Sequence, residues 1–186
     1  MDPERLILLA TAVANYTAVT WALVRGFVRP ERIDVRMRLL GMVVTACGLT
    51  TLTLLCMQPT PSPVAVAAAV TLWSLSTALI VWAIHTLRPA APGLAFCGQR
   101  PRGLVTQGPY AWVRHPLYTS YMLSLAAGFA ATGSWLLAPF AAVLCSAYVV
   151  AAREEDRILA AGELRGEFEA WRARTGAFLP KLWPSR

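Results

Sequence analysis

Long uncharged runs, set between segments that carry the charges, divide this chain into pieces of membrane-spanning length. Three such runs, 6–24, 39–57 and 64–87, contain 19, 19 and 24 residues without Asp, Glu, Lys or Arg. A helix needs about 20 mostly apolar residues to cross about 30 Å of hydrocarbon. Each of these runs therefore predicts one transmembrane helix.

The last uncharged run is too long for a single crossing. It extends over 117–152, which is 36 residues, and one straight helix of that length would measure about 54 Å. The stretch Ala-Thr-Gly-Ser at 131–134 offers a break near its middle. We expect a helical hairpin with legs at 117–131 and 135–152, which brings the number of predicted spans to five.

The C-terminal segment has helical spacing of another kind. Leu164, Phe168 and Trp171 recur at intervals of four and three residues, and charged residues occupy other positions between 163 and 174. Residues at this spacing share one face of a helix. The segment therefore predicts an amphipathic helix that lies along the membrane or caps the bundle.

The composition supports an integral membrane protein. Hydrophobic residues make up 56% of the chain, charged residues only 15%, and the mean hydropathy is +0.51. A soluble domain of this size would be less apolar. The predicted fold is all-α and polytopic, with a single membrane domain over 1–186. Within it we expect an N-terminal three-span portion at 1–103 and a core at 104–186 that holds the hairpin and the tail.

The placement of arginine predicts the orientation in the membrane. The segments 25–38 and 88–114 and the tail are rich in Arg, whereas 58–63 and 132–134 contain no Lys or Arg. Positive residues collect on the cytoplasmic side, so we expect the N-terminus outside and both long loops inside. The Ala- and Arg-rich composition favours a bacterial inner membrane. The net charge of +7 then reflects basic loops that face anionic lipid, and predicts no nucleic-acid partner.

The cysteines do not predict a metal site. None of the four, Cys47, Cys56, Cys97 and Cys145, belongs to a CxxC pair, and three of them fall within predicted transmembrane helices. Isolated cysteines in apolar helices are typical of packing residues. We therefore expect neither a bound metal nor a disulfide.

The segment Gly-Pro-Tyr-Ala-Trp-Val-Arg-His-Pro-Leu-Tyr, at 108–118, concentrates candidate chemistry directly before the hairpin. Gly and Pro predict a turn, and Pro116 suits the first turn of a helix, with His115 near its N-cap. Free N–H groups at a helix start, together with Arg114 and His115, would form an anion site. The alternative is an ordinary interfacial belt of aromatic residues with one positive-inside arginine.

A second cluster, Arg153-Glu154-Glu155-Asp156, follows the predicted end of the hairpin. Acids placed beyond the C-terminal end of a helix oppose its dipole and repel each other, so the cluster favours binding of a cation. A hairpin would bring it beside His115, and a zwitterionic ligand would then bridge the two clusters. The alternative is a solvated charge cluster in which arginines pair with the acids one turn away.

These motifs, in this order, resemble the isoprenylcysteine carboxyl methyltransferase family, which is grouped with bacterial homologues and phospholipid N-methyltransferases. The resemblance covers about 104–180. It rests on Leu-Val-Thr-Gln-Gly-Pro-Tyr-Ala-Trp-Val-Arg-His-Pro-Leu-Tyr at 104–118, Arg-Glu-Glu at 153–155 and Phe-Leu-Pro at 178–180.

The resemblance implies an integral membrane methyltransferase that uses S-adenosylmethionine, a zwitterion with a sulfonium group. It assigns nine residues to the cofactor. Leu104 and Val105 would lie beside the adenosine, and Gly108 and Tyr110 would shape the same pocket. His115, Pro116 and Tyr118 would contact the methionine and ribose parts, and Glu154 and Glu155 would bind the cationic or hydroxyl side. The sequence departs from the family pattern at Ser120, where Gly is common, and at Val150, where prenylcysteine enzymes place a substrate-contacting arginine. Arg153 is the nearest replacement.

The implied reaction is methyl transfer to the carboxylate of a lipophilic, isoprenylcysteine-like substrate that enters from the bilayer. A carboxylate is ionised at neutral pH, so no general base is needed, and Arg153 or Arg114 would orient it. If the acceptor is a phospholipid or other lipid amine, a proton must leave, and His115 or Glu155 is the candidate base. Two further alternatives are a membrane sterol reductase, usually a longer chain, and a non-enzymatic protein that keeps the scaffold.

Overall fold

The computed structural model describes residues 2–25, 35–87 and 103–181 of the 186-residue chain. Predictions that concern Cys97 or the arginines at 26–34 and 88–102 lie outside these residues. The elements are α1 Pro3–Arg25, α2 Val35–Met57, α3 Pro63–Leu87, the 3₁₀-helix η1 Gly108–Ala111, α4 Pro116–Thr132, the 3₁₀-helix η2 Trp135–Leu137, α5 Ala138–Ala161 and α6 Arg165–Arg174. Within the described residues, extended backbone pairs only at an isolated bridge between Val113 and Gly176.

The uncharged runs fold as helices, as predicted, and α1 and α2 begin a few residues earlier than their runs. Three segments of the described chain are long and apolar enough to cross a membrane: α2, α3 and Trp135–Ala161. The protein is therefore an integral membrane protein. The helix α4 has 17 residues and a length of about 26 Å. The spans at α1 and α4, and with them the count of five, stay predictions.

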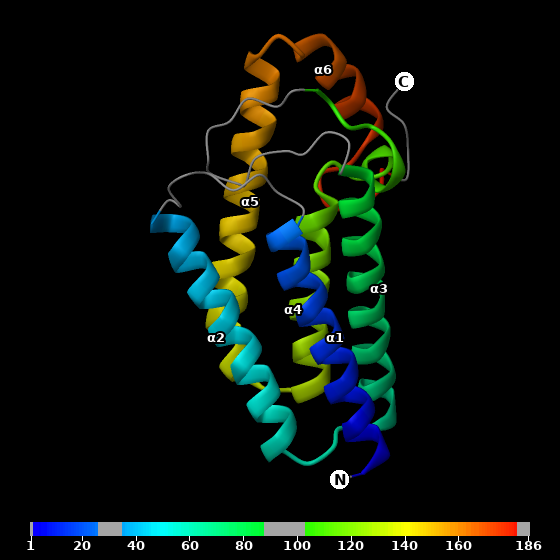
Figure 1. The fold of residues 1–186 in the computed structure, drawn as a ribbon, viewed down its shortest axis with the longest axis vertical. Coiled ribbons are helices and arrows are strands. Elements are labelled where there is room, and N and C mark those ends of the chain that lie inside the picture. Colours follow the sequence, from blue (N-terminus) through cyan, green and yellow to red (C-terminus); the bar gives the residue numbers. More distant parts are fainter. Residues whose placement is uncertain (1, 26–34, 88–102, 182–186) are drawn as a thin grey trace.

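The predicted break in the run 117–152 is confirmed. The helix α4 ends at Thr132, and Gly133 follows in the left-handed conformation with φ of 59° while its N–H bonds to the Phe129 carbonyl at 2.7 Å. Glycine is favoured there because a side chain disfavours this backbone conformation. Ser134 then caps η2 by accepting a hydrogen bond from the Leu136 N–H. The two legs of the hairpin lie at α4 and α5 (Figure 1).

A neutral polar network holds α1, α3 and α4 together inside the bundle. The amide nitrogen of Asn15 donates to Ser76 Oγ at 2.9 Å and to Thr77 Oγ1 at 3.0 Å, while its oxygen accepts from Ser124 Oγ at 2.6 Å. Ser76 Oγ donates to the Ser120 carbonyl at 2.8 Å. Hydrogen bonds between helices and small side chains at their contact are the usual means of association in membranes. This Asn15 network sets the position of α4.

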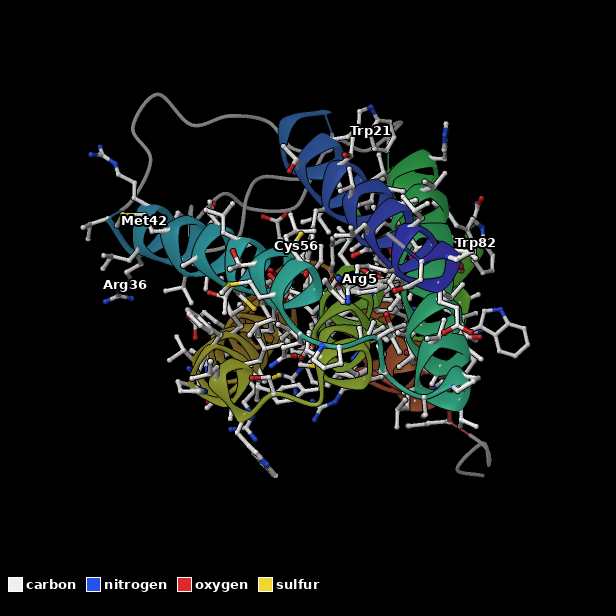
Figure 2. All side chains as sticks on the ribbon, turned by 90° about the horizontal axis from the view of Figure 1, so that it is seen from below. Arg5, Trp21, Arg36, Met42, Cys56 and Trp82 are labelled. Atoms are coloured by element: carbon white, nitrogen blue, oxygen red, sulfur yellow. The ribbon has the colours of Figure 1, made fainter. Side chains whose placement is uncertain are left out.

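Arg5 ties the starting turn of α1 to the end of α2. Its guanidinium donates to the carbonyls of Cys56 at 3.4 Å and Gln58 at 2.8 Å. In the view along the bundle from this end, Arg5 lies between the helices, whereas Met42 and Trp82 lie at the outer edge (Figure 2). A cation here also suits the negative end of the α2 dipole.

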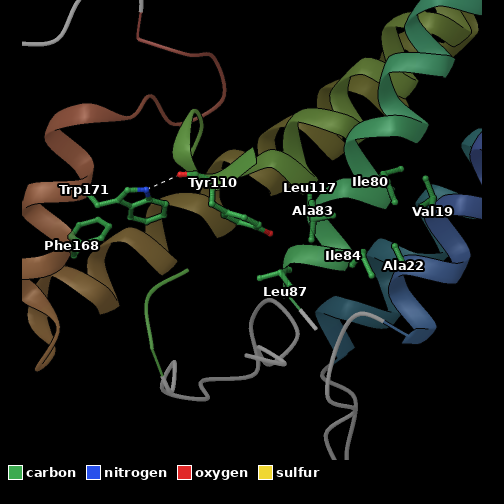
Figure 3. Close-up of a cluster of buried hydrophobic side chains, with 10 residues drawn as sticks. All are labelled: Val19, Ala22, Ile80, Ala83, Ile84, Leu87, Tyr110, Leu117, Phe168 and Trp171. Carbon is green, nitrogen blue, oxygen red and sulfur yellow. Dashed lines mark hydrogen bonds between the residues drawn. The ribbon is translucent and has the colours of Figure 1, made fainter. Parts of the chain in front are cut away.

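At the opposite end of the bundle, α6 packs against the segment that leads into α4. Phe168 and Trp171 are buried, and Trp171 Nε1 donates to the Tyr110 carbonyl at 2.8 Å (Figure 3). The other side of this apolar cluster comes from α1 and α3, through residues such as Val19 and Ile84. The helix α6 therefore docks on the protein and joins the tail to the candidate site.

Candidate functional site

The 3₁₀-helix η1 starts at a glycine that no other residue replaces without strain. Gly108 has φ of 57°, and a Cβ on it would lie 2.5 Å from Thr86 Oγ1. The close approach to α3 fixes where Pro109 and Tyr110 enter the core, and both are buried. The sequence predicted a turn here, and the structure adds the contact with α3 that requires glycine.

The entry to α4 has the predicted local structure. His115 is the N-cap residue and Pro116 is the first helical residue, where proline's missing N–H costs nothing. The cap carries no side-chain hydrogen bond of its own. The His115 side chain is therefore available for other partners.

The tail covers this entry with backbone hydrogen bonds. The N–H groups of Arg114 and His115 donate to the carbonyls of Gly176 at 2.8 Å and Ala177 at 3.0 Å. Thr119 Oγ1 donates to the Phe178 carbonyl at 2.9 Å. The N–H of His115, at the helix start that the sequence offers to an anion, thus bonds to the protein itself.

A charged network joins the start of α4 to α5. Arg114 Nη2 lies 3.1 Å from Asp156 Oδ2, and Arg114 Nη1 donates to the Thr175 carbonyl at 2.7 Å. His115 Nε2 lies 3.0 Å from Asp156 Oδ1. His115 Nδ1 lies 3.4 Å from Glu155 Oε2, and Tyr118 Oη donates to Glu155 Oε1 at 2.6 Å. We call these five residues, Arg114, His115, Tyr118, Glu155 and Asp156, the charged network.

The network favours the protonated form of His115. Burial by itself lowers the pKa of this imidazole, but the hydrogen bonds and negative charges of Asp156 and Glu155 outweigh burial and raise the pKa above its ordinary value. Each ring nitrogen faces a carboxylate. An imidazolium donates from both nitrogens, so the geometry and the charge agree.

The acidic cluster lies inside α5, which corrects one expectation. The sequence analysis placed 153–156 beyond the end of the helix, but α5 continues to Ala161. Glu155 and Asp156 pair with residues at the start of α4, so opposition to the helix dipole is not what makes these two acids favour a cation. Four consecutive helical residues point in four directions, about 100° apart. Only Glu155 and Asp156 point toward α4.

The remaining two residues of the cluster face away from this network. Arg153 and Glu154 are exposed. Glu154 Oε2 lies 2.8 Å from Arg157 Nη1, as the alternative interpretation of a solvated cluster predicts. The structure thus brings Arg114, His115, Tyr118 and Glu155 together and leaves Arg153 and Glu154 at the surface.

Several of the other predicted cofactor residues pack in or against the apolar cluster that contains Tyr110. Leu104 and Val105 are partly buried and pack on the apolar cluster that contains Tyr110, and Pro116 is buried. Burial raises the pKa of Tyr110, and the charge of Glu155 adds to this effect. Trp112, by contrast, is 62% exposed, as an interfacial aromatic residue would be.

Sequence reasoning assigned no individual role to Asp156, Tyr121 or Tyr148. Asp156 holds both Arg114 and His115. The rings of Tyr118, Tyr121 and Tyr148 pack together with centroid distances of 5.5 to 6.4 Å. We call these three residues the tyrosine cluster. Spacing carried a signal, because Tyr148 and Glu155 are seven residues apart and share one face of α5.

No metal-binding group is evident in the described part of the chain. Among residues 2–25, 35–87 and 103–181, no group of three or more His, Cys, Asp or Glu side chains is placed to hold a metal ion.

One comparison with known protein families agrees with a membrane methyltransferase. The family model described as phospholipid methyltransferase matches residues 64–161. This match starts further toward the N-terminus than the motifs suggested, since it includes α3.

Two curated proteins are similar in sequence. The cobalt-zinc-cadmium resistance protein CzcN of Cupriavidus metallidurans is 38% identical over 90 residues, which are 48% of this chain and 41% of that protein. The nickel-cobalt-cadmium resistance protein NccN of Alcaligenes xylosoxydans xylosoxydans is 32% identical over 114 residues, which are 58% of this chain and 53% of that protein. The chain spans about half the length of the curated relatives it matches.

Proposed function

The chain belongs to the phospholipid methyltransferase family, and we propose that it transfers a methyl group from S-adenosylmethionine to the carboxylate of a lipophilic, isoprenylcysteine-like acceptor in the membrane. The family implies a membrane methyltransferase; the cofactor, the acceptor and the residue roles are the proposal. The observation that carries it is the meeting of Arg114, His115 and Tyr118 with Glu155 and Asp156 at one end of the bundle.

The residues at this end suit the chemical groups of S-adenosylmethionine. Glu155 keeps a side chain that is 42% exposed and would accept hydrogen bonds from an amino group or from ribose hydroxyls. The ring of Tyr118 stacks against both His115 and Tyr148, so Tyr118 would line the methionine part through its edge. Leu104 and Val105 offer partly buried apolar side chains for the adenine. Tyr110 and Gly108 would shape that side of the pocket.

When bound, S-adenosylmethionine supplies an activated methyl group on a positively charged sulfur. The protein's own contribution is to bind, orient and exclude water. His115 and Asp156 would fix Glu155 and Tyr118 in place. His115 holds its proton between two carboxylates, so it is poorly suited to act as a base. A carboxylate acceptor needs no base, and for that reason we favour it over an amine.

An acceptor carboxylate needs a cation to orient it. Arg114 uses its donors on Asp156 and the Thr175 carbonyl, which leaves it little capacity for a substrate. Arg153 is exposed on the same stretch of α5. Arg153 lies outside the charged network and would meet a carboxylate only on the exposed side of α5. We therefore propose Arg114 as a structural partner of Asp156 and assign the orienting role to neither arginine.

The second candidate function is N-methylation of a phospholipid or other lipid amine. The description of the matching family favours it. The proton released by an amine would then pass to Glu155, whose carboxylate accepts a hydrogen bond from Tyr118. The predicted three-span portion at 1–103 would carry the helices that enclose the acceptor, while the core at 104–186 carries the site.

Calorimetric titration of S-adenosylhomocysteine into the detergent-purified protein tests the cofactor site. We expect micromolar binding that is lost in Glu155→Gln and kept in Glu154→Gln, since these neighbours differ in facing α4 or solvent. Equal loss in both variants would contradict the assignment. Absence of binding to a folded wild-type protein would contradict the cofactor itself.

A transfer assay with labelled methyl donor separates the two acceptors. We expect label in N-acetyl-S-farnesyl-cysteine and none in vesicles of phosphatidylethanolamine. The reverse result would establish the amine as acceptor.

A further inference from the structure

The hydroxyl of Tyr121 is a buried polar group without a partner. Its oxygen is shielded from solvent and makes no hydrogen bond to any described residue. Buried hydroxyls nearly always have a partner, because an unpaired one loses its hydrogen bonds to water without replacement. Within the tyrosine cluster Tyr118, by contrast, bonds to Glu155.

Tyr121 lies between the two sides of the candidate site. Its side chain packs on the apolar cluster that includes Tyr110, Leu104 and Val105, and also on the cluster that includes Tyr148. Its ring centroid is 6.4 Å from that of Tyr118 and 5.5 Å from that of Tyr148. The unpaired hydroxyl therefore belongs to the tyrosine cluster that adjoins the charged network.

Tyr121 lies deeper along α4 than the charged network. It follows His115 by six residues, which is about 9 Å of helix rise toward the interior of the bundle. A charged cofactor would stay at the level of His115 and Glu155. An acceptor whose tail remains in hydrocarbon would reach that level past the tyrosine cluster, whose rings are apolar and whose hydroxyls are polar.

We propose that Tyr121 is a specificity-determining residue whose hydroxyl donates a hydrogen bond to the acceptor's carboxylate. This inference rests on the proposed methyl transfer and deepens it. The hydroxyl keeps its proton, because the carboxylate oxygen that receives the methyl group releases none. The Tyr121 hydroxyl would gain a hydrogen bond only when the acceptor is bound. It therefore favours acceptors that place an oxygen beside it and disfavours purely apolar molecules.

The substitution Tyr121→Phe tests this role, because it removes the hydroxyl and keeps the ring. We expect two effects of opposite sign. The affinity of N-acetyl-S-farnesyl-cysteine for the protein saturated with S-adenosylhomocysteine should fall roughly fivefold to tenfold, as for one lost hydrogen bond. The melting temperature of the ligand-free protein should rise, because an unpaired buried group has been removed.

Tyr16→Phe is the matched control. Tyr16 is a partly buried tyrosine of α1 that lies against Thr51, away from the charged network. Its hydroxyl should be dispensable for both ligands. Affinity for S-adenosylhomocysteine should be unchanged in both variants, since the proposed contact is with the acceptor.

The outcomes separate this inference from the proposed function. Unchanged acceptor affinity in Tyr121→Phe, or a fall in S-adenosylhomocysteine affinity, overturns the role of Tyr121 while leaving methyl transfer intact. If the wild type binds neither ligand, the proposed function fails. The melting temperature still tests Tyr121 when no ligand binds. If it is unchanged or lower in Tyr121→Phe, the Tyr121 hydroxyl is not an unpaired buried group and this inference is overturned.

Discussion

Two buried polar clusters lie along α4, and they differ in charge. The Asn15 network is neutral and joins α1, α3 and α4, with Asn15, Ser76 and Ser120 all fully buried. The charged network joins the start of α4 to α5 and to the tail, and the side chain of Glu155 in it is 42% exposed. Neutral partners keep the same hydrogen bonds at every pH. An ionised side chain can leave its partner in the protein and bind a charged ligand instead. The free-energy cost of this exchange depends on the charges involved.

The two clusters therefore suit different roles. The neutral cluster suits the packing of helices, and the charged cluster suits the binding of a ligand. In hydrocarbon, neutral side-chain hydrogen bonds specify which helices meet and at which register. Solvent reaches part of the charged network through Glu155, so opposite charges can be held close without complete desolvation. The same helix therefore has a fixed position at Ser124 and would form one side of the proposed binding site at His115.

The substitution Asp156→Ala should have the largest effect. It leaves the buried Arg114 without its carboxylate partner and removes one of the two anions that hold His115. We expect a loss of about 3 kcal/mol in the free energy of unfolding, together with loss of S-adenosylhomocysteine binding. Chemical denaturation in detergent and calorimetry measure the two effects. Glu154→Ala, two residues away on α5 and exposed, is the control, and an equal loss there would refute the distinction between the two residues.

Asn15→Leu should have the next largest effect and a different character. It removes the partner of Ser124 and Ser76, and we expect a destabilisation of about 1–2 kcal/mol. Because no ionisable group is involved, the loss should be the same at every pH, and the surviving protein should bind S-adenosylhomocysteine normally. Thr20→Val, which removes an exposed hydroxyl on the same helix, is the control. A pH-dependent loss would show that the two clusters are coupled.

The pH dependence of stability should come from the charged network. The pKa of folded His115 is raised, so its contribution is fully present below the unfolded pKa of about 6.5 and is lost as the pH rises through the folded value. We expect the melting temperature to fall as the pH rises from neutral through the raised pKa. His115→Gln should remove that slope, whereas Asn15→Leu should retain it. A wild-type profile that is flat above neutral pH would contradict a protonated His115.

Glu154→Gln should have the smallest effect. The pair that Glu154 forms with Arg157 is exposed and spans one turn of α5, and such pairs contribute about 0.5 kcal/mol or less. Neither the melting temperature nor the affinity for S-adenosylhomocysteine should change appreciably. A loss of binding here would place Glu154 in the site, as the family resemblance implied, and would require α5 to rotate.

The sequence by itself determined the helices and where the site begins. Uncharged runs of about 20 residues must form helices in a bilayer, because each backbone polar group needs an internal partner there. Pro116 and Gly133 marked the two ends of α4, since proline suits a helix start and glycine a left-handed end. The order of the two polar motifs brought His115 and Glu155 to one end of the predicted hairpin.

Only the tertiary structure decided which neighbours of these residues take part. In 153–156 each position differs from the next by about 100° around α5, so the rotation of the helix selects Glu155 and Asp156 and leaves Arg153 and Glu154 outside. The hydrogen bond from Asn15 to Ser76 joins residues that are 61 positions apart in the sequence. The hydrogen bond from Arg114 to the Thr175 carbonyl spans the same number of positions. Contacts between helices depend on how the helices pack and rotate against each other. The hydrophobic periodicity of a single segment determines neither.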